Sequence, residues 1–384
     1  MIAEHDKTYR IFISAAEASG DAHCGGLITA LKESGYNIEF VGVGGGKMAS
    51  AGCKMLETTV DKAAMAYEAF SKVGYYYKLI NRITHYLKSE KIDLVIVCDS
   101  PAFNFHIAKA AKKAGIKTLF YVAPQLWAWA SWRIDKLKNC CDKLCCILPF
   151  EQEWFSQRGV EAVFVGNPLL DELQSPLANS RKKYENFEPK NATIALMPGS
   201  RAAEINSLWR PMQQIATRIK KEYPQANFVT VAVDDKTKEI LKSSQIIGFR
   251  CKYTVGSVSE TSKAADFAIV ASGSATLQVA AAGCPMVVMY QSSRILWQLL
   301  GRWLLKTKHL SLVNILANRD LVPEFMPYFS SINPIVETIE QLLNQKNKLI
   351  QTSSELIELA EPLVKKKARG EVSQIVLEML HVSA

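Results

Sequence analysis

The stretch that decides the fold is Thr193-Ile-Ala-Leu-Met-Pro-Gly-Ser-Arg-Ala-Ala-Glu-Ile205. Its apolar first half predicts a strand that stops at Pro198 and Gly199, and a helix follows with Ser200 within reach of its first free N–H groups. The N-terminal end of a helix attracts anions, and Arg201 can donate to two phosphate oxygens at once. The stretch therefore predicts a strand–turn–helix unit that binds a phosphate group.

A second stretch repeats this arrangement. In Ala265-Asp-Phe-Ala-Ile-Val-Ala-Ser-Gly-Ser-Ala-Thr276 an apolar strand again runs into a glycine turn and a hydroxyl-capped helix, which continues through Gln278. Either stretch alone also fits an ordinary helix cap in an α/β domain. Together with Arg201, the two loops predict a site that grips one nucleotide diphosphate.

Short apolar runs alternate with helical stretches along most of the chain. This alternation is typical of parallel sheets, because each crossover between parallel strands needs a helix. The sequence therefore predicts an α/β fold with two doubly wound, Rossmann-like domains. The expected strands are residues 9–15, 38–43, 94–98, 118–123, 144–148 and 163–165 in the first domain, and residues 194–197, 228–233, 251–254, 267–271 and 286–290 in the second.

The length of 384 residues exceeds what one hydrophobic core usually supports. A polar stretch at 174–190, with two prolines, interrupts the alternation and is expected to be a linker. We expect residues 1–173 to form the first domain and residues 191–365 the second. Ligands bind at the carboxyl ends of the strands in such folds, so we expect the chemistry in a cleft between the two sheets.

The composition narrows the class of protein. The formal net charge of +9 is spread along the chain, which fits a protein that binds anionic lipid or a phosphorylated substrate. It is only weak evidence for binding to nucleic acid. Nine cysteines, with no apolar and cleavable leader before Tyr9, favour a reducing, cytosolic compartment. No apolar run approaches the roughly 20 residues that span a bilayer. Cysteines 140, 141, 145 and 146 lack the spacing of a zinc site, so we expect a buried strand there and no metal.

Polar side chains follow two expected strands of the first domain. Glu17, Ser19 and Asp21 follow strand 9–15, and such a negatively charged turn suits sugar hydroxyls better than phosphate. Capping of the next helix is the alternative. Asp99 follows strand 94–98 and is a candidate general base, with a turn-initiating aspartate as the alternative.

Two stretches have the composition of lipid-contacting segments, although core burial is the alternative for both. Residues 63–77 are rich in apolar and aromatic side chains, and residues 294–308 combine tryptophans and leucines with four cationic side chains. A third aromatic segment, 121–132, has three tryptophans followed by Arg133, and we interpret it as packing between domains rather than stacking on a ligand. The candidate lipid contacts are Met65, Tyr67, Phe70, Val73, Tyr76, Trp297 and Trp303.

In their order and spacing, these motifs resemble lipid A disaccharide synthase, a family of inverting glycosyltransferases with the GT-B fold. The resemblance implies that UDP-2,3-diacylglucosamine is joined to 2,3-diacylglucosamine 1-phosphate, which releases UDP and forms a β-1,6-linked disaccharide at the cytoplasmic face of the inner membrane. It implies C-terminal helices at about 366–384 that cross back onto the first domain, no cofactor, and a homodimer by C-terminal exchange as one arrangement. The motifs are Glu17-Ala-Ser-Gly-Asp21, Asp99-Ser-Pro-Ala-Phe-Asn104, Trp127-Ala-Trp129, Leu148-Pro-Phe-Glu151, Pro198-Gly-Ser-Arg201, Ser272-Gly-Ser-Ala-Thr-Leu277 and Ser311-Leu-Val-Asn-Ile-Leu316.

Carried over residue by residue, the resemblance implies that Asp99 is the base and that Arg201 binds the donor diphosphate. The acceptor's 6-hydroxyl would attack the anomeric carbon while UDP leaves from the opposite face. The chain has no Asp-x-Asp pair of the kind that holds a metal in other glycosyltransferases. The implied catalytic set is Glu17, Ser19, Asp21, Asp99 and Asn314. The implied UDP-binding set is Pro198, Gly199, Ser200, Arg201, Glu204, Ser272, Gly273, Ser274, Thr276 and Gln278.

The chain departs from the family pattern at four positions. Ala102 replaces a second carboxylate, Asn167 a histidine, Gln278 a glutamate and Ala66 a glycine. Two alternatives therefore stay open. One is another GT-B enzyme, such as a UDP-sugar epimerase or a transferase for a different lipid-linked sugar. The other is a catalytically silent lipid or nucleotide-sugar binding protein.

Overall fold

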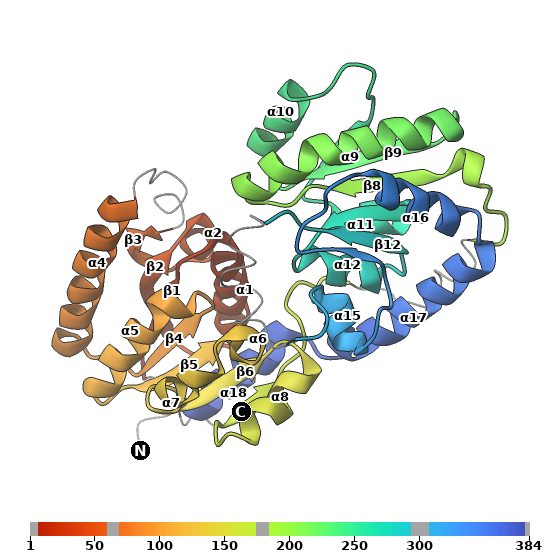
Figure 1. The fold of residues 1–384 in the computed structure, drawn as a ribbon. Coiled ribbons are helices and arrows are strands. Elements are labelled where there is room, and N and C mark those ends of the chain that lie inside the picture. The colour runs from red at the N-terminus through yellow and green to blue at the C-terminus, as the bar shows by residue number, and fades with distance from the viewer. Residues whose placement is uncertain (1–6, 60–68, 174–183, 293–306, 381–384) are drawn as a thin grey trace. The chain divides into compact units, whose positions relative to one another are not determined.

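The structure, a computed structural model, describes residues 7–59, 69–173, 184–292 and 307–380, and for residues 69–73 it describes the backbone only. The chain forms two compact units (Figure 1). Unit 1 comprises Met1–Asp171 with Lys365–Ala384, and unit 2 comprises Glu172–Val364.

Unit 1 is built on a seven-stranded parallel sheet with the strand order β3-β2-β1-β4-β5-β6-β7. The order reverses between β1 and β4, which run side by side with Ala15 opposite Cys98. In open α/β sheets, ligands bind outside the carboxyl ends of the strands at such a reversal. The strands are β1 (Tyr9–Ala15), β2 (Ile38–Gly44), β3 (Lys54–Thr58), β4 (Leu94–Cys98), β5 (Lys117–Tyr121), β6 (Lys143–Cys146) and β7 (Ala162–Phe164).

Helices cover both faces of this sheet. Alternate residues of β1, such as Ile11 and Ile13, pack against Leu27 of α1 and Val376 of α18, while α4 and α5 lie on the opposite face (Figure 1). The helices are α1 (Ala18–Glu33), α2 (Gly46–Ser50), α4 (Ala69–Ser89), α5 (Pro101–Lys113), α6 (Leu126–Trp129), η2 (Ser131–Arg133), α7 (Ile134–Lys138), α8 (Pro149–Ser156) and α18 (Ala368–Met379).

Unit 2 is built on a six-stranded parallel sheet with the order β10-β9-β8-β11-β12-β13. Here the order reverses between β8 and β11, where Met197 lies opposite Val270. The loops at 198–201 and 272–274 therefore follow neighbouring strands. The strands are β8 (Thr193–Met197), β9 (Asn227–Ala232), β10 (Lys252–Val255), β11 (Phe267–Ala271), β12 (Met286–Met289) and β13 (Glu324–Phe325).

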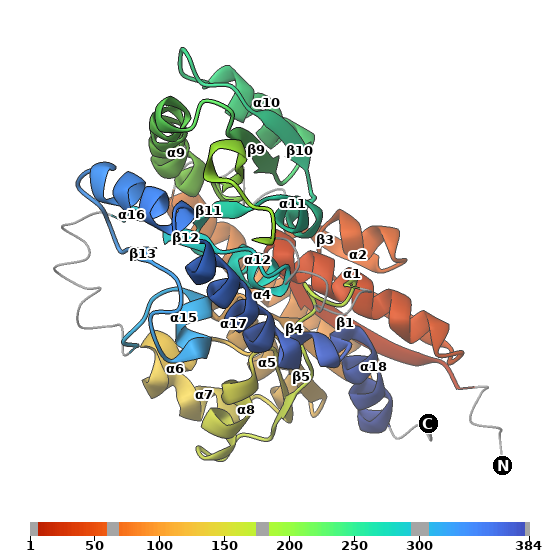
Figure 2. The same ribbon diagram turned by 90° about the vertical axis from the view of Figure 1, so that its right-hand side faces the viewer.

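The core of unit 2 joins this sheet to α9 and α16, which lie side by side (Figure 2). Leu196, Leu208 and Ile339 are fully buried within it. The helices are η4 (Pro189–Asn191), α9 (Ala202–Glu222), α10 (Asp235–Ser243), α11 (Val258–Ala264), α12 (Ala275–Ala281), α15 (Leu312–Ala317), α16 (Asn333–Leu343) and α17 (Lys346–Lys365).

The predicted α/β fold class is confirmed, and each of the eleven expected strands is present. Two short strands were missed: β3, which is only half-buried, and β13, which has two residues. The expected strand 118–123 ends at Tyr121, because Val122 turns into the left-handed region with φ 66°. Of the expected linker, residues 174–183 lie outside the described part. Tyr184 is fully buried in the core of unit 2 and donates its hydroxyl to the Asp266 carbonyl at 2.8 Å.

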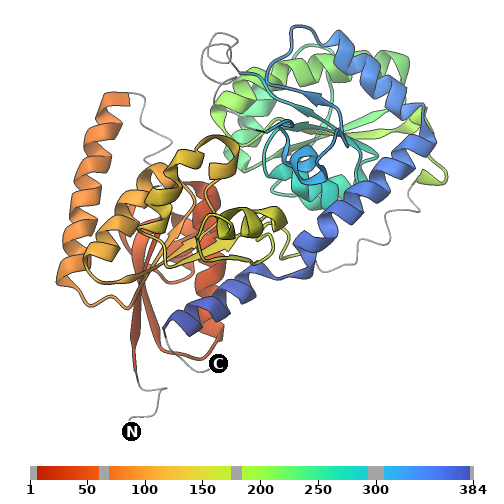
Figure 3. The same cartoon turned by 60° about the horizontal axis from the view of Figure 1, so that its bottom comes forward.

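The C-terminal helix α18 belongs to unit 1 (Figure 3). The Asp171 carboxylate accepts hydrogen bonds from the first backbone N–H groups of α18, at Ala368 (2.8 Å) and Arg369 (2.9 Å). The side chains of Lys366 and Lys367 donate to the carbonyls of Phe164 and Asp171, each at 3.0 Å. The chain therefore docks α18 by polar contacts at its start and by apolar packing along its length.

Replacing Asp171 tests this docking. Asp171→Ala removes the acceptor for two N–H groups, so we expect it to destabilise unit 1 by about 1–2 kcal/mol and to speed hydrogen exchange in α18. The matched control is Asp234→Ala, which removes the cap of α10 in unit 2, where Asp234 accepts from Thr237 N–H at 2.7 Å. Unchanged exchange in α18 of the Asp171 variant would contradict the assignment.

Candidate active site

The turn that follows β4 has an unusual backbone. Asp99 and Ser100 both lie in the left-handed region, with φ of 53° and 42°. Such a conformation costs roughly 1–3 kcal/mol for each residue with a side chain and concentrates at functional sites. Asp99 is half-buried, and its N–H donates to the Tyr121 carbonyl at 3.2 Å. The candidate base thus stands on a strained turn beside the strand-order reversal.

Asn104 holds this turn in place. Its side chain is fully buried, and Nδ2 donates to the carbonyl oxygens of Cys98 and Asp99, each at 2.8 Å. Its Oδ1 accepts a hydrogen bond from Ser14 Oγ of β1 at 2.7 Å. Asn104 therefore ties the two central strands together and fixes the direction of Asp99. The sequence analysis quoted this residue within a motif but gave it no role.

Two members of the predicted N-terminal set lie at the same edge of the sheet. Glu17 precedes α1, and its Oε1 accepts a hydrogen bond from Ser100 Oγ at 3.2 Å. Ser19 is exposed in the first turn of α1. Burial, and then the charge of Glu17, raise the pKa of Tyr76, whose ring packs on Phe103 of α5 at 5.4 Å. The structure thus brings Glu17, Ser19, Asp99 and Tyr76 to one edge.

Asp21, another member of the predicted catalytic set, has a structural role. Its carboxylate is buried, with Oδ1 accepting from the N–H groups of Gly45 (2.8 Å) and Met48 (3.0 Å) and Oδ2 accepting from Lys47 N–H at 3.0 Å. These N–H groups open α2. Both oxygens are occupied by backbone, so Asp21 positions the loop after β2.

The first loop of unit 2 carries the predicted phosphate site. The N-cap of α9 is Arg201, and the cap is completed by Glu204 rather than by the expected Ser200 hydroxyl. Glu204 Oε2 accepts from the N–H groups of Ser200 (3.0 Å) and Arg201 (3.2 Å), and its Oε1 pairs with Arg201 Nη1 at 3.2 Å. Gly199 has φ 100°, and a Cβ there would lie 2.3 Å from Glu204 Oε2. The chain's own carboxylate thus occupies the anion position, and the side chain of Arg201 stays 70% exposed.

The second loop is held by its own hydroxyl. Thr276 is fully buried, and its Oγ1 donates to the Gly273 carbonyl at 2.7 Å, so it shapes the loop from inside. The predicted contact between Thr276 and UDP stays a prediction. Ser274 is exposed at the start of α12, Ser272 is half-buried, and Gln278 is half-buried within α12.

Asn314 is another structural residue among the predicted catalytic ones. It is fully buried, its Nδ2 donates to the Val322 carbonyl at 2.8 Å, and its Oδ1 accepts from the N–H groups of Leu321 (2.9 Å) and Val322 (3.0 Å). These bonds fix the turn before β13. Its side chain therefore has a structural role.

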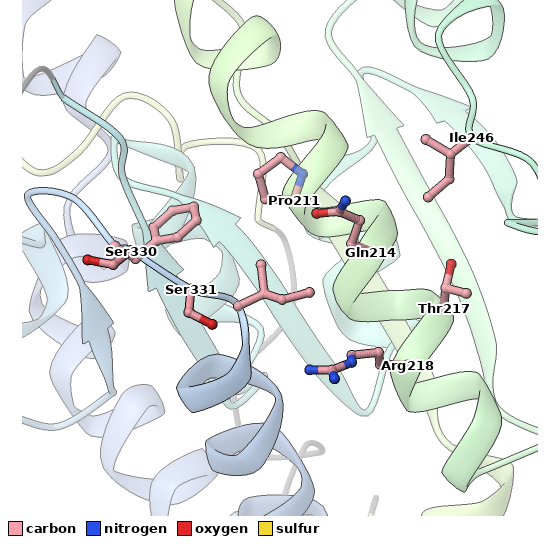
Figure 4. A pocket seen from close by; sticks show the side chains of 9 residues that line it. Pro211, Gln214, Thr217, Arg218, Ile246, Ser330 and Ser331 are labelled. Atoms are coloured by element: carbon pink, nitrogen blue, oxygen red, sulfur yellow. The ribbon is translucent and has the colours of Figure 1, made fainter.

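Four predicted lipid contacts, Met65, Tyr67, Trp297 and Trp303, lie outside the described residues, as do the side chains of Phe70 and Val73. Within the described ranges, no helix is long and apolar enough to cross a membrane. The same ranges contain no group of three or more His, Cys, Asp or Glu side chains that could hold a metal ion. A cavity of about 610 Å³ lies between α9 and residues 329–332 (Figure 4). Its lining begins at Pro211, in the middle of α9, so it is separate from the loop at Arg201.

A buried carboxylate that the sequence analysis missed supports the tryptophan segment. Glu151 Oε1 accepts from Trp127 Nε1 at 2.9 Å, and Oε2 accepts from the N–H groups of Ile147 (3.2 Å) and Leu148 (3.1 Å). Burial raises the pKa of Glu151 to about 7, although these N–H donors oppose the rise. Pro149 followed by a glutamate at the third helical position is a capping pattern that could have revealed this role. Trp127 is therefore anchored inside unit 1.

Comparison with solved structures defines the class of fold. A UDP-GlcNAc 2-epimerase from Neisseria meningitidis, solved bound to UDP-GlcNAc, matches with a TM-score of 0.58 and 12% identity, over 98% of this chain and 100% of that chain. The glycosyltransferase of kitacinnamycin matches with a TM-score of 0.63 and 12% identity, over 97% of this chain and 100% of that chain. Two Rossmann-like units of this kind form the GT-B fold, as predicted.

Sequence comparison identifies the family. The family model of lipid-A-disaccharide synthetase matches residues 11–378. Lipid-A-disaccharide synthase 1 of Legionella pneumophila is 32% identical over 378 residues, which cover 97% of this chain and 97% of that protein. The chain belongs to the lipid-A-disaccharide synthetase family, and the predicted resemblance is confirmed.

The raised pKa of Glu151 predicts how stability depends on pH. Between about 4.5 and about 7 the folded protein keeps the Glu151 proton, whereas the unfolded chain has lost it. The free energy of unfolding therefore falls as pH rises through this window, by on the order of 3 kcal/mol from this group. Glu151→Gln should remove that part of the slope in denaturant titrations. Glu153→Gln, an exposed neighbour on α8, should keep it, and equal slopes for the wild type and Glu151→Gln would contradict the prediction.

Proposed function

We propose that the protein joins UDP-2,3-diacylglucosamine to 2,3-diacylglucosamine 1-phosphate, forming a β-1,6-linked disaccharide 1-phosphate and UDP. Family membership supports the reaction class. The observation that carries the mechanism is the strained turn of Asp99, fixed by Asn104 at the strand-order reversal of unit 1. A carboxylate held in such a place is preorganised to accept a proton.

The proposed step is a direct displacement. The acceptor's 6-oxygen forms a bond to the donor's anomeric carbon while its proton passes to the Asp99 carboxylate. The bond from the anomeric carbon to the β-phosphate oxygen breaks, and its electron pair leaves with UDP. Because attack and departure occur on opposite faces, the configuration at the anomeric carbon inverts.

Unit 2 supplies the donor contacts in this proposal. Negative charge grows on the diphosphate as the bond to the sugar breaks, so a fixed cation there stabilises the transition state. Arg201 is that cation, with the N–H groups of Ser200 and Arg201 as further donors. Ser272, Ser274 and Gln278 complete the proposed UDP contacts, and Thr276 shapes their loop from inside. No metal ion takes part.

The acceptor and donor both carry acyl chains, so we place the enzyme at the cytoplasmic face of the inner membrane as a peripheral protein. Residues 63–77 and 294–308 are the proposed lipid-contacting segments, on composition alone. Exchange of C-terminal segments between two copies stays a prediction, and in the chain described here α18 packs on its own unit 1.

Replacing the base tests the mechanism. Asp99→Asn removes the carboxylate but keeps a side chain that tolerates the left-handed backbone, so we expect turnover to fall by about 10²–10⁴-fold with UDP affinity unchanged. Disaccharide formation and calorimetric UDP binding are the two measurements. Asp235→Asn, at a largely exposed carboxylate of unit 2, is the control. A nearly active Asp99→Asn would exclude Asp99 as the base.

Replacing the cation tests the donor site. Arg201→Ala removes a charge-assisted contact to the diphosphate, so we expect UDP affinity to fall by at least about tenfold and turnover to fall further. Arg210→Ala, on the same helix and exposed, should leave both unchanged. An unchanged UDP affinity in Arg201→Ala would contradict the assignment.

One incubation distinguishes the proposed reaction from the alternatives. A UDP-sugar epimerase is the second candidate, because the Neisseria meningitidis epimerase shares the fold. Pure protein incubated with both diacylated substrates should yield disaccharide and UDP, whereas an epimerase would convert UDP-GlcNAc without an acceptor. A silent binding protein would do neither.

A further inference from the structure

An aromatic and cationic patch stands exposed on unit 1, beside the helices α6 and α7. Trp132 is 60% exposed and Trp129 is 38% exposed, and their rings meet edge to face with centroids 6.5 Å apart. The Arg133 guanidinium lies over both rings, at 5.3 Å from Trp129 and 5.9 Å from Trp132. We call these three residues the tryptophan–arginine patch.

Further cationic side chains lie on α7 and on the neighbouring helix α5. Lys136, one turn after Arg133, lies with its Nζ 4.9 Å from the Phe105 ring, so α5 and α7 are neighbours. Burial, and then the charges of Lys136 and Lys109, lower the pKa of His106, which shows that all three side chains lie close together. Within the described part of the chain, Arg133, Lys136 and Lys109 form no ion pair with a carboxylate. The nearby Asp135 pairs with Lys138 at 3.8 Å.

Buried side chains of the same segment anchor the patch. Trp127 of the same segment is buried, hydrogen-bonded to Glu151 and packed edge to face on Phe150 at 4.9 Å. Leu137 of α7 is fully buried. Buried apolar side chains therefore anchor this segment, while the indoles of Trp129 and Trp132 are exposed. Exposed aromatic surface beside unpaired cations marks a site of interaction.

We propose that the tryptophan–arginine patch docks on an anionic lipid bilayer. Tryptophan places its apolar ring and its polar N–H at the boundary between acyl chains and water, where such residues gather in membrane proteins. Arginine and lysine beside it are attracted to the negative surface of the leaflet. The choice of a bilayer as the partner rests on the proposed function, whose substrates are lipids. The patch itself is distinct from the segments 63–77 and 294–308.

The position of the patch suits this role. It follows β5, which pairs with β4 so that Tyr121 lies opposite Cys98, the residue before Asp99. Patch and candidate base therefore follow neighbouring strands at the carboxyl edge of one sheet. A bilayer that binds the patch would hold that edge near the leaflet in which a diacylated acceptor is embedded.

Vesicle binding tests the proposal. We expect the full-length protein to sediment with phosphatidylglycerol vesicles, and Trp132→Ala to weaken that binding by about tenfold and Arg133→Ala by about fivefold. The Arg133 effect should shrink at high salt. Arg158→Ala is the matched control, because Arg158 also lies over a tryptophan of unit 1, Trp154, at 4.0 Å. If the patch variants bind vesicles as tightly as the wild type does, the proposal is overturned.

A second assay separates a docking surface from a substrate site. With short-chain substrates dispersed in nonionic detergent, the patch variants should turn over like the wild type, and they should be slower only on vesicles. Equal losses in detergent and on vesicles would place the patch in the substrate site and overturn the docking role. If the wild type makes no disaccharide in either assay, the proposed function fails, while the sedimentation result still decides the patch. Sedimentation with RNA or a protein in place of vesicles would likewise overturn the choice of partner.

Discussion

The first N–H groups of a helix need acceptors, and in this fold acidic side chains meet that requirement at several helix starts. Asp21 supplies acceptors to α2, Glu151 to α8, Glu204 to α9 and Asp171 to α18. Each carboxylate is thereby fixed in place by backbone bonds. The parallel sheets create many such helix starts, so most acidic side chains near the strand ends have structural roles.

Asn104 holds the turn at Asp99 through carbonyl oxygens rather than through N–H groups. Asn104 donates to the carbonyls of Cys98 and Asp99, and Ser14 donates to Asn104. The Asn104 amide thus holds carbonyl oxygens in place, whereas Asp21, Glu151, Glu204 and Asp171 accept from N–H groups. The N-cap of α5 is Ser100, which forms no side-chain cap bond. This turn places two adjacent residues, Asp99 and Ser100, in the strained left-handed region. The strained backbone at Asp99 therefore distinguishes the candidate base from carboxylates such as Asp21, which bind backbone N–H groups.

The sequence predicts the architecture well because parallel strands and their helices leave periodic, local signals. Each expected strand is present, and the misses are β3, which is half polar, and β13, which is too short to show a period. The site is harder to predict, since a motif marks positions but not the direction of side chains. Asp21 and Asn314 belong to such motifs, yet their side chains form hydrogen bonds with backbone groups of the protein. Glu151 and Asn104 act through contacts between elements that only the fold brings together.

Glu204 holds the loop at Gly199, the proposed anion site, in its conformation. Glu204 neutralises Arg201 and occupies the N–H groups of Ser200 and Arg201, so the loop is neither short of acceptors nor repelled by its own charge. A diphosphate can use these donors only by taking them from Glu204, and two anions there would repel each other. The affinity of the loop for a diphosphate is therefore the difference between how strongly the diphosphate and Glu204 bind the same N–H groups and the same Arg201. In the proposed reaction this competition would lower the affinity for UDP, which has to leave after each transfer.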